Sequence, residues 1–127
     1  MDRALKPLLL VFAAGQLVIG VLLWAAPGFF FEQIGPYAPR NDHYMADLAS
    51  FYLTLAAVAF VAARRPAWRV PVLAVATIQY ALHSLNHLID IGDADPGWLG
   101  PANFASLAAT TALLAWMLAT ARREVAR

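Results

Sequence analysis

The sequence predicts an all-α integral membrane protein, a four-helix bundle whose termini are both cytoplasmic. Of its 127 residues, 61% are hydrophobic and 13% are charged, whereas soluble domains are about half apolar and about a quarter charged. The apolar residues form four stretches, each close to the roughly 20 residues that cross a bilayer as a helix. The basic residues gather at one side of these stretches. Together these observations predict the fold and its orientation.

The first span is predicted over residues 5–26. Pro27 and Gly28 follow it and are predicted to end it, because proline cannot continue an established helix. The next segment, residues 29–41, mixes aromatic residues with glycine and proline. Such a mixture is typical of a connection that lies at the membrane interface.

The other three spans are predicted over residues 42–63, 68–89 and 98–121. Asn41 or Asp42 offers an N-cap for the second span, and Arg64-Arg65-Pro66 closes it with a tight turn. The four tryptophans fall near span ends, as in the aromatic belts of membrane proteins. The spans nearly exhaust the chain, so residues 1–127 are predicted to form a single domain, with any chemistry inside the bundle or at its rims.

The basic residues orient the predicted bundle. Arg40 alone lies on the side away from the termini. The others lie on the side of the termini: Arg3, Lys6, Arg64, Arg65, Arg69, Arg122, Arg123 and Arg127. The positive-inside rule therefore places both termini in the cytoplasm. The net charge of +1 and the absence of a strongly basic helix argue against a nucleic-acid partner.

Polar residues within the predicted spans are the candidate functional residues, since a bilayer disfavours burying them. His43 and Asp47 are one helical turn apart on the second span, and His83 and His87 are one turn apart on the third. The second span begins at the outer rim and the third ends there, so all four side chains are expected at one depth. The sequence therefore predicts a metal site in the outer half of the bundle, with these ligands: His43, Asp47, His83 and His87.

Imidazole and carboxylate ligands suit Zn, Fe, Cu, Ni or Mn, without deciding among them. Gln79, Asn86 and Asp90 are predicted to orient the imidazole rings by hydrogen bonds from outside the ligand set. Haem fits less well, because two histidines one turn apart on the same helix cannot straddle it. The chain has no cysteine, which excludes iron–sulfur clusters and thiolate zinc.

Two other functions use the same residues and stay open. The polar stripes can be hydrogen-bonded contacts between helices. In that case the protein is an accessory or scaffold subunit of a larger membrane complex, or a homo-oligomer. Alternatively, Asp47 or a histidine serves as the general base of a membrane enzyme with a lipid-soluble substrate. No nucleophile motif or phosphate loop selects a reaction.

Several features together resemble the DoxX-like group of small four-helix bacterial membrane proteins, in particular its uncharacterised actinobacterial members. The residues that carry this resemblance are Gly35-Pro36-Tyr37, His43, Asp47, His83 and Asn86-His87. The resemblance covers nearly the whole chain, and many Ala and Arg beside a single Lys fit a GC-rich genome. It implies a four-helix bundle in the inner (plasma) membrane. Some members of the group look like accessory subunits of membrane oxidoreductases, but the resemblance implies no particular activity.

Overall fold

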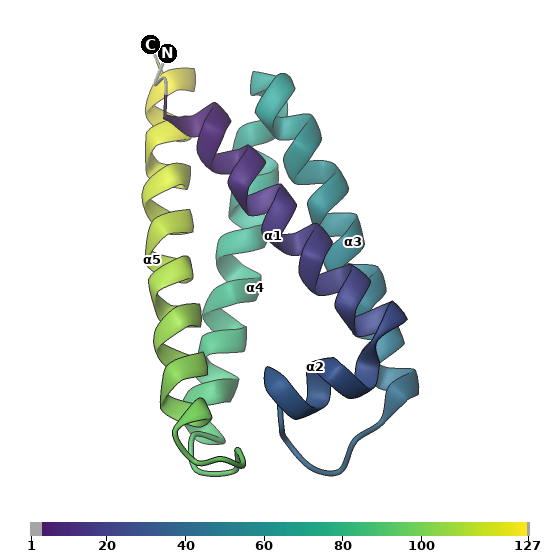
Figure 1. Cartoon of the computed structure of the whole chain (residues 1–127). Helices are drawn as coiled ribbons and strands as arrows, with labels where there is room; N and C mark the ends of the chain where they lie inside the picture. Colours follow the sequence, from purple (N-terminus) through teal and green to yellow (C-terminus); the bar gives the residue numbers. More distant parts are fainter. Residues whose placement is uncertain (1–3, 127) are drawn as a thin grey trace.

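The computed structural model describes residues 4–126, and this part of the chain is helical without strands. Four long helices carry the fold, and Figure 1 labels them. They are α1 (Leu5–Ala25), α3 (Asp42–Arg64), α4 (Arg69–Ile89) and α5 (Leu99–Val125). Each is long and apolar enough to cross a membrane, with the 3-10 turn Pro66–Trp68 extending the fourth candidate span ahead of α4. The four predicted helices are therefore confirmed, and the largest boundary difference is at α5, which continues to Val125.

The segment after α1 differs from the prediction, because it contains a further short helix, α2 (Pro27–Gln33). Ala26 breaks α1 with a φ of −140°. Pro27 then occupies the first helical position of α2. A residue at this position makes no intrahelical hydrogen bond through its N–H, so proline loses nothing there, and its fixed φ suits a helix start. The same proline therefore ends one helix and begins the next.

The bundle has two distinct ends. Both termini lie at one end together with the turn between α3 and α4, and this is called the terminal end (Figure 1). α2 and the loop between α4 and α5 lie at the other, called the α2 end. The arginines at positions 3 and 127 lie outside the described residues. The other basic residues predicted on the terminus side all lie in the turns or helix ends of the terminal end.

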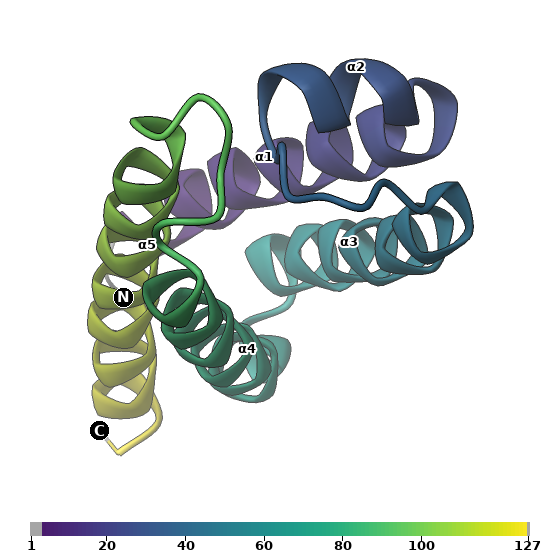
Figure 2. The same ribbon diagram turned by 90° about the horizontal axis from the view of Figure 1, so that it is seen from below.

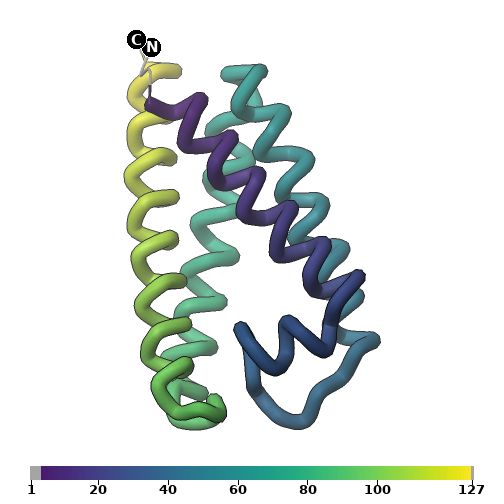
Figure 3. The backbone as a smooth tube through the Cα atoms, viewed as in Figure 1, coloured from purple at the N-terminus to yellow at the C-terminus, as the bar shows by residue number. Residues whose placement is uncertain are grey.

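The helices pack as two pairs that diverge. α1 packs along α3, and α4 packs along α5. The two pairs approach each other at the terminal end and separate toward the α2 end (Figures 1 and 2), and the backbone trace in Figure 3 shows the same divergence without the ribbon width.

The buried side chains explain this shape. The main core draws on all four long helices, and its largest fully buried members lie in the terminal half: Leu5, Leu9, Leu73, Leu114 and Met117. Alanines of α3 such as Ala59 and Ala62 are fully buried and let the helices approach closely. A second, smaller core of Leu23, Ala49 and Tyr52 joins only α1 and α3. The two helix pairs therefore share one core at the terminal end, whereas toward the α2 end α1 and α3 have a small core of their own.

Two contacts hold α5 against the preceding part of the chain. At the terminal end, Nη1 of Arg69 lies 2.9 Å from Oε2 of Glu124, and Arg69 is only 3% exposed. At the α2 end, the first turn of α5 lies so close to the preceding loop that a side chain at Gly100 would clash with the carbonyl oxygen of Ile91. These contacts set the position of α5, and so of the side chains that it presents at the α2 end.

Candidate functional site

A cavity of about 410 Å³ lies at the α2 end, in the space left by the diverging helix pairs. Each of the helices α1 to α5 contributes to its wall. The wall is largely apolar and rich in aromatic side chains, among them Phe30, Phe31, Tyr44 and Tyr52. Pockets that bind small molecules have roughly 300–1,000 Å³ and a mainly apolar lining with a few polar groups. The cavity has the size and composition of such a pocket.

α2 and the loop that follows it form one side of this cavity. The chain turns back after α1, so that α2 lies across the end of the bundle opposite the termini (Figure 1). Two hydrogen bonds tie the loop to the α4–α5 pair. Nδ2 of Asn103 donates to the carbonyl oxygen of Ile34 at 3.0 Å. The backbone N–H of Asp95 donates to the carbonyl oxygen of Pro36 at 3.4 Å. The loop therefore bridges the two helix pairs where their own packing is absent.

A row of three polar side chains lies at the cavity wall. The Tyr37 hydroxyl is 3.0 Å from Nδ1 of His87, and Nε2 of His87 is 3.1 Å from Nε2 of His83. Nδ1 of His83 is buried and has no hydrogen-bond partner among the described residues. All three residues line the cavity. The row therefore ends on a nitrogen whose hydrogen-bonding capacity the described protein does not satisfy.

Proton placement in this row has two alternatives. If Tyr37 donates to Nδ1 of His87, then Nε2 of His87 carries a proton and donates to His83. In the opposite arrangement, His83 donates to His87 and His87 donates to the Tyr37 oxygen. Only one proton fits between the two Nε2 atoms at 3.1 Å, so the two imidazoles cannot both be doubly protonated in this geometry. The buried Nδ1 of His83 is thus a donor in the first arrangement and an acceptor in the second.

Two further polar groups face the same space. Tyr52 is 4% exposed and lines the cavity, and its hydroxyl forms no hydrogen bond with another described residue. Asn103 donates to Ile34 through its amide nitrogen, which leaves its Oδ1 without a described partner. Buried polar groups are normally hydrogen-bonded. A bound molecule with a hydroxyl or carbonyl group would provide partners for both.

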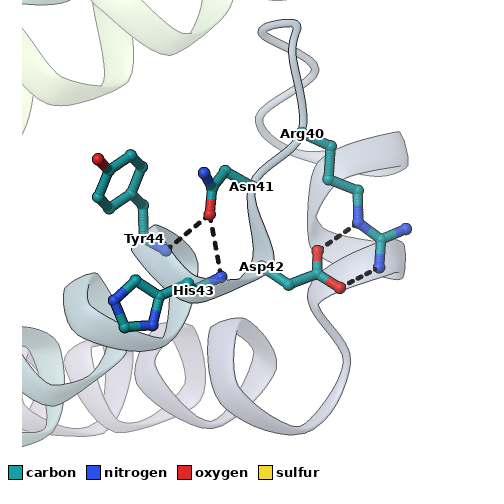
Figure 4. Close-up of polar contacts among 5 residues, drawn as sticks. All are labelled: Arg40, Asn41, Asp42, His43 and Tyr44. Atoms are coloured by element: carbon teal, nitrogen blue, oxygen red, sulfur yellow. Dashed lines mark hydrogen bonds and ion pairs between the residues drawn. The ribbon is translucent and has the colours of Figure 1, made fainter.

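A charged residue, Arg40, lies at the rim of the cavity. It forms an ion pair with Asp42, two residues further along the chain. Two guanidinium nitrogens of Arg40 donate to the Asp42 carboxylate (Figure 4), one of them at 2.9 Å. These hydrogen bonds raise the pKa of the Arg40 guanidinium. Figure 4 also shows Asn41, whose side-chain oxygen accepts from the backbone N–H groups of His43 and Tyr44 at 3.1 and 3.2 Å. Asn41 is therefore the N-cap of α3.

The structure does not bring the four predicted metal ligands together. His83 and His87 meet as predicted from their spacing, but His43 and Asp47 lie elsewhere. Those two side chains are 80% and 67% exposed, contact each other at 3.6 Å and do not line the cavity. The reason is that α3 diverges from α4 at this end and that the His43 side chain, in the first turn of α3, faces away from the cavity that its neighbours Tyr44 and Met45 line. Within residues 4–126, no group of three or more histidine, aspartate or glutamate side chains is placed to hold a metal.

The three residues predicted to orient the histidines are not hydrogen-bonded to them. In the described part of the chain, Gln79, Asn86 and Asp90 form no side-chain hydrogen bond with either histidine. Oε1 of Gln79 is buried without a described partner, and Asn86 is exposed. Tyr37 takes the predicted orienting role instead. The sequence marked it only as an interfacial aromatic residue between turn formers, and a lone loop tyrosine carries no stronger signal.

No family model, curated protein or solved structure matches this chain. The resemblance to the DoxX-like group therefore stays a prediction. Function has to be argued from the chemistry of the site, because a helical bundle on its own supports many activities.

The position of Asp47 gives a direct test of the four-ligand hypothesis. Because its carboxylate is exposed and remote from the cavity, we expect Asp47→Ala to change the free energy of unfolding by less than about 0.5 kcal/mol. Any metal that co-purifies should be unaffected as well, whereas His83→Ala should release it. Elemental analysis of the purified variants measures this. If Asp47→Ala lost as much metal as His83→Ala, the result would support the predicted four-ligand site.

Proposed function

We propose that the protein is a multi-pass membrane protein that binds a lipid-soluble small molecule with a polar end group in the cavity at the α2 end. The single observation that carries this proposal is an apolar cavity whose wall holds polar groups without protein partners. Two elements of the proposal need separate support: residence in a membrane and the chemistry of the bound molecule.

Residence in the membrane is supported by the outward-facing side chains of the long helices. Large apolar residues such as Val11, Ile78 and Leu82 are 62–70% exposed, and a soluble monomer rarely exposes so much contiguous apolar surface. Lipid accommodates it without cost. The basic residues at the terminal end support a cytoplasmic location of that end, by the positive-inside rule. The cavity then lies in the outer half of the inner membrane.

The bound molecule is inferred from the two kinds of wall. Aromatic and aliphatic side chains such as Phe30 and Leu48 suit a hydrocarbon body, because they offer no hydrogen bonds. The hydroxyl of Tyr52 and Oδ1 of Asn103 suit a hydroxyl or carbonyl end group, with the Tyr37–His87–His83 row in the same wall. Histidine and tyrosine can also accept or donate a proton there, so this site accommodates the enzyme hypothesis as well as simple binding.

A metal is a poorer fit to this site. His83 and His87 supply two nitrogen ligands, whereas typical zinc sites take three or four ligands from the protein. Tyr37 already occupies the second nitrogen of His87. The hydrogen-bonded row accounts for these side chains without an ion.

Photolabelling tests the proposal. The probe is a neutral long-chain alcohol that carries a diazirine in its chain, added to the protein in bilayer nanodiscs of a zwitterionic lipid. We expect the label on peptides that line the cavity. Ser106 lines the cavity, so Ser106→Phe should fill it and lower the labelling of those peptides about tenfold. An otherwise identical alkane probe without the hydroxyl should label the wild type about fivefold less, because it forms no hydrogen bond.

Ala105→Phe is the matched control. Ala105 precedes Ser106 on α5, is exposed and does not line the cavity, so the same added bulk should leave labelling unchanged. Equal labelling of the two phenylalanine variants would reject the cavity as the binding site. The accessory or scaffold hypothesis would then be favoured, in which the polar groups act only between helices.

A further inference from the structure

A second cavity lies between α3 and α4, and it shares no lining residue with the first. It has a volume of about 560 Å³ and extends from the middle of α3 to the turn at the terminal end. Phe51 and Val58 of α3 form one wall, and Pro71 and Val75 of α4 form the other. Trp68, which is 45% exposed, lies at the end next to the turn. This space is called the α3–α4 groove.

The α3–α4 groove offers an occupant almost no hydrogen bonds. Its one hydroxyl, on Thr54, donates to the carbonyl oxygen of Ser50 within the same helix at 2.8 Å. The remaining wall is aliphatic or aromatic. An elongated apolar groove on the lipid-facing side of a membrane bundle suits an alkyl chain, which needs no polar partner.

Unpaired positive charge lies at the mouth of the groove. Arg65 is the C-cap residue of α3 and lies in the turn two residues before Ala67, which lines the groove together with Trp68. Arg64 precedes it, and its guanidinium carbon lies 3.8 Å from the centroid of the Phe60 ring, which is not part of the groove wall. Neither has a carboxylate partner among residues 4–126. The neighbouring Arg69, in contrast, is paired with Glu124.

We propose that the α3–α4 groove binds one acyl chain of an anionic phospholipid whose headgroup phosphate contacts Arg65. The charge at the mouth complements the phosphate, and Trp68 occupies the interfacial depth that tryptophan favours. Basic residues next to a membrane helix attract anionic lipid, and the adjoining groove would convert that attraction into a defined site. The inference depends on residence in a membrane and not on what the first cavity binds.

Quenching of Trp68 by brominated lipids tests this inference. The protein is prepared with Trp24, Trp98 and Trp116 replaced by phenylalanine, so that Trp68 is the only tryptophan. It is then reconstituted into phosphatidylcholine bilayers. Increasing fractions of chain-brominated phosphatidylglycerol or chain-brominated phosphatidylcholine are added in parallel. We expect the association constant at Trp68 to be about fivefold higher for the anionic lipid.

Three variants separate a site from diffuse attraction. Arg64→Ala/Arg65→Ala should abolish the preference for phosphatidylglycerol. Arg122→Ala/Arg123→Ala removes the same charge from the same end of the bundle and should retain the preference. Val75→Phe narrows the groove with the arginines intact and should weaken quenching by both lipids. These positions are exposed, so helicity and thermal unfolding in detergent should match the parent protein.

Three results would overturn the inference. Equal quenching of the parent protein by both lipids would mean that ordinary bilayer lipid fills the groove. Loss of the preference in Arg122→Ala/Arg123→Ala to the same extent as in Arg64→Ala/Arg65→Ala would mean diffuse attraction to the whole basic end. Protection of Trp68 from both lipids, with a dimer mass by sedimentation in detergent, would assign the groove to a second copy of the chain. None of these results bears on photolabelling of the first cavity, so the two proposals fail independently.

Discussion

Glu124→Gln is expected to lower the free energy of unfolding by about 3 kcal/mol, because it leaves a buried guanidinium without its counter-charge. Arg69 is 3% exposed, and its contact with Glu124 is a hydrogen-bonded ion pair of 2.9 Å. Nε of Arg69 is buried without a described partner, so the arginine has little other compensation. The neutral amide of glutamine can accept a hydrogen bond but cannot balance the charge. Unfolding in mixed detergent–SDS micelles, followed by circular dichroism, measures the loss.

Two further variants identify the cause of that loss. Arg69→Met/Glu124→Gln removes the buried charge as well and should recover most of the lost stability, since well-packed apolar groups often replace a buried pair at little cost. Asp42→Asn breaks the Arg40–Asp42 pair, whose side chains are 40% and 55% exposed, and should cost much less stability, because solvent screens an exposed pair. If Glu124→Gln costs no more than Asp42→Asn, the buried pair does not hold α4 to α5.

The four long helices could be predicted because a single property, a run of apolar residues of sufficient length, determines each of them. α2 could not, since a proline followed by glycine indicates a helix end as strongly as a helix start. At Pro27 it is both. The three phenylalanines of α2 are also compatible with an irregular interfacial segment. Only the packing of Phe30 against the small core at the α2 end distinguishes the two.

The candidate site was predictable only where it depends on one helix. His83 and His87 meet because residues four apart share a face. Depth in the membrane predicted that His43 and Asp47 lie at the same level, but not which way α3 faces or that it diverges from α4. Those features depend on the buried alanines and leucines of the terminal half, which draw the pairs together at one end only. Tyr52 was missed for a related reason, because a tyrosine in an apolar span resembles core.

Gly100→Ala is expected to lower the free energy of unfolding by about 3 kcal/mol, because the new Cβ would overlap the carbonyl oxygen of Ile91. That oxygen belongs to the backbone, so relief requires a shift of the loop or of the whole first turn of α5. Asn103 and Ser106 follow within two turns and line the cavity. The shift should therefore also reduce photolabelling of the cavity by the diazirine alcohol. The same SDS titration and the same labelling assay measure both effects.

Gly97→Ala is the control for this effect. It lies in the same loop, a Cβ there would meet nothing within 4 Å, and no described glycine has a positive φ. We therefore expect a change of less than about 0.5 kcal/mol and unchanged labelling. If Gly100→Ala is destabilised but labels like the wild type, the cavity does not depend on where α5 begins. If both measures fall together only in Gly100→Ala, the close approach of α5 to the Ile91 carbonyl positions the polar wall of the site.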